Sequence, residues 1–164
     1  MADRPELVVG WEQLRRMAQN LSGRIAQDGR PDVVVGILRG GMIPAVLIAH
    51  ALGSRSVRAI EVTHTTADGV KAPKTSQPQI RDRHTLGELT ELDVLVVNDI
   101  AGTGDTMAAT VALVRQAGAS RVRTLACVVN ERNWYRARTD KPDEALTYIG
   151  TVVEGWVIFP WEKQ

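Results

Sequence analysis

The residues best suited to chemistry lie in one ten-residue stretch, NDIAGTGDTM, which runs from Asn98 to Met107. The stretch follows four apolar residues, VLVV, and precedes the segment AATVALVRQAGA, whose composition is typical of a helix. It therefore brings an amide, carboxylates, glycines and threonines to the connection between a buried strand and a helix. Such a connection collects polar side chains and free backbone N–H groups at one point of the fold.

This stretch predicts a phosphate site at the start of the helix. Helix N-termini offer unpaired N–H groups and the positive end of the helix dipole, which favour an anion. Gly102 and Gly104 let the backbone approach a phosphate closely, and Thr103 and Thr106 add hydroxyl donors. Asp99, at the end of the strand, is placed to bind sugar hydroxyls or a metal. A phosphate beside hydroxyl groups describes a phosphorylated ribose.

Other phosphate loops fit this sequence less well. The chain has no G-x-x-x-x-G-K-[ST] motif, and the G-x-G-x-x-G motif fails because Met107 stands at its third glycine. About twenty residues later the chain reads SRVRT, without the acid that binds a dinucleotide ribose. One alternative stays open, namely a plain strand-to-helix connection capped by Asp105 or Thr103.

Apolar spacing and glycine or proline punctuation predict the elements that position this stretch. Helices are expected over residues 11–27, about 43–52 and 105–117, and strands over 33–38, 56–64, 94–97 and 122–129. This β-α-β order predicts an α/β fold, with a parallel sheet flanked by helices. Residues 64–92 are polar and aperiodic and predict a long flexible loop that covers a site. Residues 130–164 are expected to be irregular.

Bulk composition narrows the class of protein. A chain of 164 residues suits a single domain, residues 1–164. The net charge of +1 argues against nucleic acid or an anionic membrane as a partner, and the N-terminus does not resemble a signal peptide. The single cysteine, Cys127, lies in an apolar run and reads as a small core residue. A reduced, cytoplasmic location is therefore expected.

Three motifs resemble those of a known family, the type I phosphoribosyltransferases. The strand, acidic pair and T-G-x-T pattern around residues 98–106 resemble the signature for phosphoribosyl pyrophosphate (PRPP). The segment GILRGG, residues 36–41, resembles the pyrophosphate loop of that family. The ending GWVIFPWEKQ is similar to the C-terminal hood of the small xanthine, guanine and hypoxanthine phosphoribosyltransferases of bacteria and archaea. The resemblance covers nearly the whole chain and implies the type I fold, with a small hood over about 130–164.

The resemblance implies transfer of ribose 5-phosphate from PRPP to a nitrogenous base, purine or purine-like, with Mg2+ as cofactor and pyrophosphate as product. The implied PRPP contacts are Arg39, Gly40, Gly41, Ala101, Gly102, Thr103, Gly104, Asp105 and Thr106. The implied catalytic residues are Asn98 and Asp99 at the ribose, and the implied metal ligands are Asp99 and Glu162. Trp156 is implied to stack on the base and the backbone of Val157 to read its edge. The partners are then PRPP and a free base, and a homo-oligomer is expected.

Some of these residues have a plainer interpretation that stays open. Trp156 and Trp161 can serve only to pack the C-terminal segment onto the body of the protein. Asp105 is an unusual neighbour for a phosphate, and a capping role is the simpler interpretation. His64 and His84 lack metal-ligand spacing and are expected to be incidental.

The sequence also departs from the family at three positions. Asn98 stands where the family has an acid. A carboxylate about 5 Å from a developing positive charge stabilises that charge by roughly 3 kcal/mol at an effective dielectric of about 20, and an amide does not do so. Gly102 stands where the purine branch has an aspartate that assists proton transfer, so a base that ionises easily would need less help. The strand after the helix ends in VVNERNW and lacks the usual lysine, although Arg132 lies close by.

These departures leave three further hypotheses beside a purine-type enzyme. The chain could act on an atypical heterocycle in specialised metabolism. It could be a regulator that binds PRPP or a nucleotide without catalysis, which the changes at positions 98 and 102 favour and the aromatic hood opposes. It could also run the reaction in reverse, cleaving a nucleotide with pyrophosphate.

Overall fold

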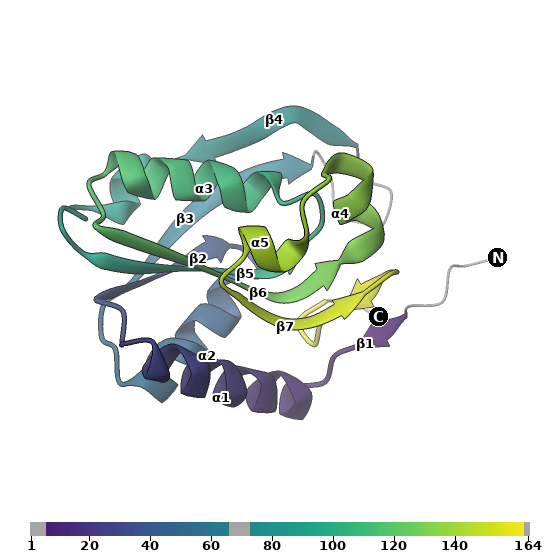
Figure 1. Ribbon diagram of the computed structural model, residues 1–164, viewed down its shortest axis with the longest axis horizontal. Helices are drawn as coiled ribbons and strands as arrows, with labels where there is room; N and C mark the ends of the chain where they lie inside the picture. Colours follow the sequence, from purple (N-terminus) through teal and green to yellow (C-terminus); the bar gives the residue numbers. More distant parts are fainter. Residues whose placement is uncertain (1–5, 66–72, 163–164) are drawn as a thin grey trace.

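The computed structural model describes residues 6–65 and 73–162, and its centre is a six-stranded sheet (Figure 1). The strand order is β4-β3-β2-β5-β6-β7, and every neighbouring pair is parallel except β3 with β4. In that order the strands span Lys74–Arg81, Val57–Thr65, Val33–Leu38, Asp93–Ala101, Arg121–Asn130 and Tyr148–Val153. The predicted α/β class and its largely parallel sheet are confirmed.

Helices cover both faces of this sheet (Figure 1). One face carries α1 (Trp11–Gln27) and α2 (Met42–Leu52), and the other carries α3 (Asp105–Gln116), α4 (Glu131–Ala137) and α5 (Pro142–Ala145). Each face has its own apolar core, and Cys127 is buried in the core beneath α1 and α2. Because both faces of the central strands are buried, their sequences are continuous apolar runs rather than alternating ones.

Strand β5 is longer than the sequence predicts. It continues through the first four residues of the polar stretch and ends at Ala101, so only Gly102, Thr103 and Gly104 form the turn into α3. Successive side chains of a strand point to opposite faces. In β5, Val97 packs on the α1–α2 side and Val96 on the α3 side. This alternation decides where the side chains of Asn98 and Asp99 go.

The expectation of an irregular loop over residues 64–92 is wrong for much of its length. Residues 74–81 form the antiparallel edge strand β4, and a short 3-10 turn, η1 (Arg83–Leu86), follows it. The sequence KTSQPQIR was misread because this edge strand is polar, and a proline is tolerated on an edge. Residues 66–72, and with them part of the predicted covering loop, lie outside the described residues.

The C-terminal part is also more regular than expected. Besides α4 and α5 it contains β7, which extends the main sheet, and β8 (Val157–Ile158). Strand β8 pairs in parallel with β1 (Leu7–Val8), so the N-terminal residues complete the hood. No helix in the described part of the chain has the length and apolar character needed to cross a membrane.

Candidate functional site

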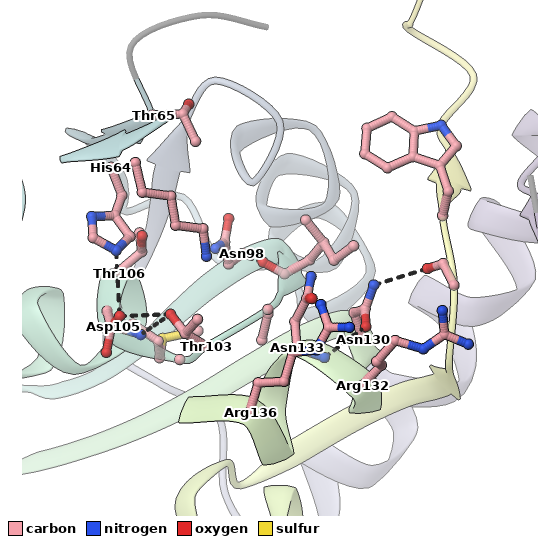
Figure 2. Close-up of a pocket in the computed structure, with 18 of the residues that line it drawn as sticks. His64, Thr65, Asn98, Thr103, Asp105, Thr106, Asn130, Arg132, Asn133 and Arg136 are labelled. Atoms are coloured by element: carbon pink, nitrogen blue, oxygen red, sulfur yellow. Dashed lines mark hydrogen bonds and ion pairs between the residues drawn. The ribbon is translucent and has the colours of Figure 1, made fainter. Parts of the chain in front are cut away.

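A cavity of about 730 Å³ lies beyond the carboxyl ends of the central strands (Figure 2). In sheets of this kind, ligands bind at that edge. The cavity brings together seven residues that the sequence predicts for a site: Asn98, Ala101, Gly102, Thr103, Gly104, Asp105 and Thr106. Trp156 lines it as well, from the hood. The cavity therefore joins the turn before α3 to the predicted base-stacking residue.

The turn before α3 is held from behind by aromatic packing. Gly104 has a φ of 82°, and a Cβ at this position would lie 2.9 Å from Cζ3 of the buried Trp134. The Arg138 guanidinium stacks over the Trp134 ring at 4.8 Å and pairs with both oxygens of Asp140. Only glycine fits such a backbone, so the loop is fixed with its N–H groups at the start of a twelve-residue helix.

Asp105 is part of the cavity wall rather than a helix cap turned away from it. Gly104 is the N-cap residue of α3, and the Asp105 carboxylate accepts a hydrogen bond from the Thr103 hydroxyl at 2.7 Å. His64 Nε2 lies 3.3 Å from the same carboxylate oxygen, and Figure 2 marks this contact with a dashed line. His64, which the sequence interpretation set aside as incidental, thus lines the cavity and connects β3 to the turn before α3. The sequence gives no signal for it, since the contact depends on tertiary packing alone.

Asn98 points into the cavity from β5, but its amide is engaged locally. Its Nδ2 donates to the carbonyl of Ile100 at 3.0 Å, and its Oδ1 accepts from the backbone N–H of Asp99 at 3.0 Å. An amide has a second N–H and a second lone pair, so it can still contact a sugar hydroxyl. The two backbone bonds fix its orientation.

Asp99 lies on the opposite face of β5 and does not line the cavity. A Cβ at Gly40 would lie 1.8 Å from Oδ2 of Asp99, so this carboxylate sits directly against the loop after β2. The backbone N–H of Ile100 donates to its Oδ1 at 2.8 Å. Burial raises the pKa of Asp99 to about 6, against this hydrogen bond, and the nearby Glu162 charge adds to the rise.

The predicted pyrophosphate loop also lies outside the lining of the cavity. A Cβ at Gly41 would lie 2.6 Å from the carbonyl oxygen of Ile37 and 2.7 Å from that of Val97, so glycine is required there for close backbone packing. Arg39 is exposed. The loop is connected to the rest of the site through the contact between Gly40 and Asp99.

The sequence predicts Asp99 and Glu162 as the ligands of a magnesium ion. Asp99 and Glu162 are close enough for the charge of one to raise the pKa of the other. Glu162 is held in place because its Oε2 accepts the backbone N–H of Phe159 at 2.8 Å. Among the described residues, no group of three or more side chains forms a metal site. Mg2+ commonly takes one or two carboxylates and completes its shell with phosphate oxygens and water, so this pair suits it.

The hood contributes the other end of the cavity. Trp156 is partly exposed there, whereas Trp161 stacks on Phe159 at 4.8 Å and packs on the core. The packing interpretation thus holds for Trp161. The side chain of Val157 is buried in the core, so only its backbone is left for recognition, as the sequence interpretation requires.

Helix α4 supplies cavity residues that sequence reasoning missed or mentioned only in passing. Asn130, its N-cap, accepts the backbone N–H of Asn133 at 3.0 Å and donates through Nδ2 to the carbonyl of Gly155 at 2.9 Å. These bonds tie α4 to the residue preceding Trp156. Further lining residues are His64, Thr65, Lys74, Arg132, Asn133, Arg136, Glu154 and Glu6. In the sequence, the only indication of α4 was Asn130, a residue type that is common at helix N-caps.

Comparison with known proteins now decides the family. Residues 10–163 match the model of the phosphoribosyl transferase domain family. The chain belongs to this family. The predicted phosphoribosyltransferase fold and enzyme class are therefore confirmed.

Individual relatives agree with this family membership. The chain is 28% identical over 161 residues to a xanthine-guanine phosphoribosyltransferase of Ruegeria sp. (strain TM1040), covering 94% of this chain and 84% of that one. It resembles the crystal structure of a purine phosphoribosyltransferase from Pyrococcus horikoshii, with a TM-score of 0.76, 26% identity and coverage of 96% and 95%. A hypoxanthine phosphoribosyltransferase of Staphylococcus aureus shares the fold, with a TM-score of 0.69, 20% identity and coverage of 92% and 77%. The predicted likeness to the small purine phosphoribosyltransferases is confirmed.

Proposed function

We propose that the protein transfers ribose 5-phosphate from PRPP to a ring nitrogen of a purine or purine-like base and releases pyrophosphate. The observation that carries this proposal is the single cavity that runs from the glycine turn to Trp156 and passes Asn98. A nucleoside monophosphate has the same three parts in the same order, namely phosphate, ribose and base. The named relatives act in this class of reaction and support the proposal.

The residues divide between the two ends of this cavity. The backbone of residues 101–106, with the hydroxyls of Thr103 and Thr106, holds the 5′-phosphate at the start of α3. Asn98 holds a ribose hydroxyl, and Trp156 stacks on the base. Figure 2 shows the phosphate-end residues His64, Thr103 and Asp105 on one side and the α4 residues on the other. The ribose lies between them.

Asp99 has a separate role on the pyrophosphate side. Together with Glu162 it would hold Mg2+, beside the loop of Arg39, Gly40 and Gly41 that would receive pyrophosphate. A magnesium ion held there would supply positive charge to the departing pyrophosphate oxygens. Asp99 lies between this loop and the end of β5, a position that supports a role in holding leaving group and ribose at one fixed distance.

A regulator that binds PRPP without turning it over is the second candidate. One observation favours it, namely that the Nδ2 and Oδ1 atoms of Asn98 each bond to the backbone. Position 98 therefore supplies no charge, and its side chain is not free to rotate. The acceptor wall made by α4 and Trp156 supports the enzyme instead, since binding PRPP alone needs no surface for a base.

Release of pyrophosphate from Mg2+-PRPP separates the two candidates. The assay takes a panel of 6-oxopurines, adenine and modified purine-like heterocycles, with PRPP binding measured in parallel by calorimetry. Base-dependent release supports the enzyme. Binding of PRPP without release for any base supports the regulator, and absence of both overturns the site assignment.

A further inference from the structure

The cavity wall that faces the glycine turn carries a neutral amide. A Cβ at Gly102 would lie 3.8 Å from both Cβ and Nδ2 of Asn133, so the two residues are neighbours where the glycine turn approaches α4. The Asn133 side chain forms no hydrogen bond with residues 6–65 or 73–162, although its backbone N–H is held by Asn130. Its amide is therefore available to a ligand. Neither Gly102 nor Asn133 supplies a carboxylate that could accept a proton from a bound base.

Two guanidinium groups accompany this amide. Arg132 and Arg136 lie one turn apart on α4, and both line the cavity. Within the described ranges neither arginine forms an ion pair or a hydrogen bond. By contrast Arg138, the C-cap residue of α4, donates two hydrogen bonds to Asp140, at 2.8 and 2.7 Å. An exposed arginine without a partner is ordinary by itself. Two on the cavity side of one helix, beside a free amide, make this wall cationic.

The remaining charges of the cavity come from other elements. Lys74, His64 and Asp105 belong to the phosphate end. Glu6 and Glu154 come from the hood, where the Glu6 carboxylate lies against Gly155. The one acid on α4, Glu131, does not line the cavity. The charges on the wall beside Asn133 are therefore positive, and the carboxylates of the acceptor end belong to the hood.

We propose that the acceptor base binds and reacts as its anion, which deepens and rests on the proposed transfer reaction. The lone pair on the ionised ring nitrogen forms the new bond to C1 of the ribose. The bond from C1 to the pyrophosphate oxygen breaks, and its electron pair leaves with pyrophosphate. The ring proton is lost to solvent before the reaction, so no general base is required at position 102. Arg132 and Arg136 favour the anion, and Asn133 donates a hydrogen bond to its edge.

The substrate class is then a purine-like heterocycle whose ring N–H ionises close to neutral pH. A matched pair of bases tests this, because 8-azaguanine and guanine have nearly the same shape and the additional nitrogen makes the ring N–H more acidic. We expect kcat/KM at pH 7 to be at least tenfold higher for the 8-aza base. The advantage should shrink as the pH rises and guanine itself ionises. Equal kcat/KM for the two bases at pH 7, or a ratio that does not change with pH, overturns the inference.

Two pairs of variants test the residues. Gly102→Asp adds a negative charge next to Asn133, and Gly102→Asn adds the same shape without charge; neither is strained, since a Cβ fits there at 3.8 Å. We expect kcat/KM for 8-azaguanine to be about tenfold lower in Gly102→Asp than in Gly102→Asn. Arg136→Gln should lower kcat/KM at least threefold for both bases, since both react as anions, with Tyr135→Phe, on an exposed residue of the same helix, as control.

The outcomes separate this inference from the proposed function. No loss for either base in Arg136→Gln beyond that in Tyr135→Phe, or equal activity of the two position-102 variants, overturns the anionic acceptor and leaves the transfer reaction standing. Absence of pyrophosphate release with every base overturns the proposed function as well.

Discussion

Replacing Asp99 with asparagine tests how much folding stability is lost by burying an ionised carboxylate at this site. Burial, with a contribution from Glu162, raises the pKa of Asp99 from 3.8 to about 6. The folded pKa lies above the unfolded one, so the folded protein binds the proton more tightly. Stability from this group is therefore fully present below about pH 4 and is lost as the pH rises through about 6. At pH 7 and above, a rise of this size corresponds to about 3 kcal/mol of lost stability.

Asp99→Asn removes this cost and keeps an oxygen that can accept the backbone N–H of Ile100. In urea denaturation with EDTA present, we expect the variant to be more stable than the parent by up to about 3 kcal/mol at pH 8. At pH 4 the difference should be small. A gain of that size corresponds to a rise in Tm of roughly 6–12 °C for a domain of this length. Pyrophosphate release should fall below detection in the same variant.

The exposed Asp143 on α5 provides the control, and Asp143→Asn should leave the free energy of unfolding nearly unchanged at both pH values. Three results would refute the reasoning. A variant at position 99 that is no more stable than the parent at pH 8 contradicts the burial cost. One that is stabilised equally at pH 4 and pH 8 contradicts the assignment to ionisation. One that keeps full turnover removes Asp99 from the site.

Further predictions concern the hood, the glycine loops and the clamp to α4. Trp156→Ala should raise KM for the base at least tenfold and KM for PRPP little, whereas equal effects on both would favour a packing role. Gly41→Ala should lower the free energy of unfolding by roughly 1–3 kcal/mol, because the added Cβ would clash with backbone oxygens. Gly102→Ala should lower it by less than about 1 kcal/mol, because the added Cβ makes only ordinary contacts there. Chemical denaturation that ranks the two variants in the opposite order would contradict this packing. Asn130→Ala should lower the free energy of unfolding by about 1 kcal/mol in thermal melts and raise KM for the base, because the cap of α4 and the bond to Gly155 are both lost. An unchanged KM would contradict the role of Asn130 in tying α4 to the hood.

The sequence predicts the centre of the fold well because the central strands are buried on both faces. Their apolar runs, the glycines that end the helices and the polar stretch after β5 are local signals, and local signals survive in a single sequence. The phosphate end of the cavity follows from such signals. The edge strand β4 does not, because its residues alternate only weakly and face solvent.

Several contacts around the cavity could not be predicted in the same way. Asn98 and Asp99 are adjacent in sequence, yet β5 places them on opposite faces, and only knowing that the strand continues to Ala101 reveals this. The approach of Asn133 to Gly102 depends on how α4 folds back over the turn. The contact of His64 with Asp105 depends in the same way on packing between β3 and α3.

The most direct test of the account is to identify the product. The protein is incubated with Mg2+, PRPP and each base of the panel. The compounds formed are then separated by chromatography, and their masses are measured by mass spectrometry. We expect a new compound with the mass of the base joined to ribose 5-phosphate, formed in equal amount with pyrophosphate and absent with Asp99→Asn. Pyrophosphate release without any such compound, or a product that forms equally well in Asp99→Asn, would contradict it.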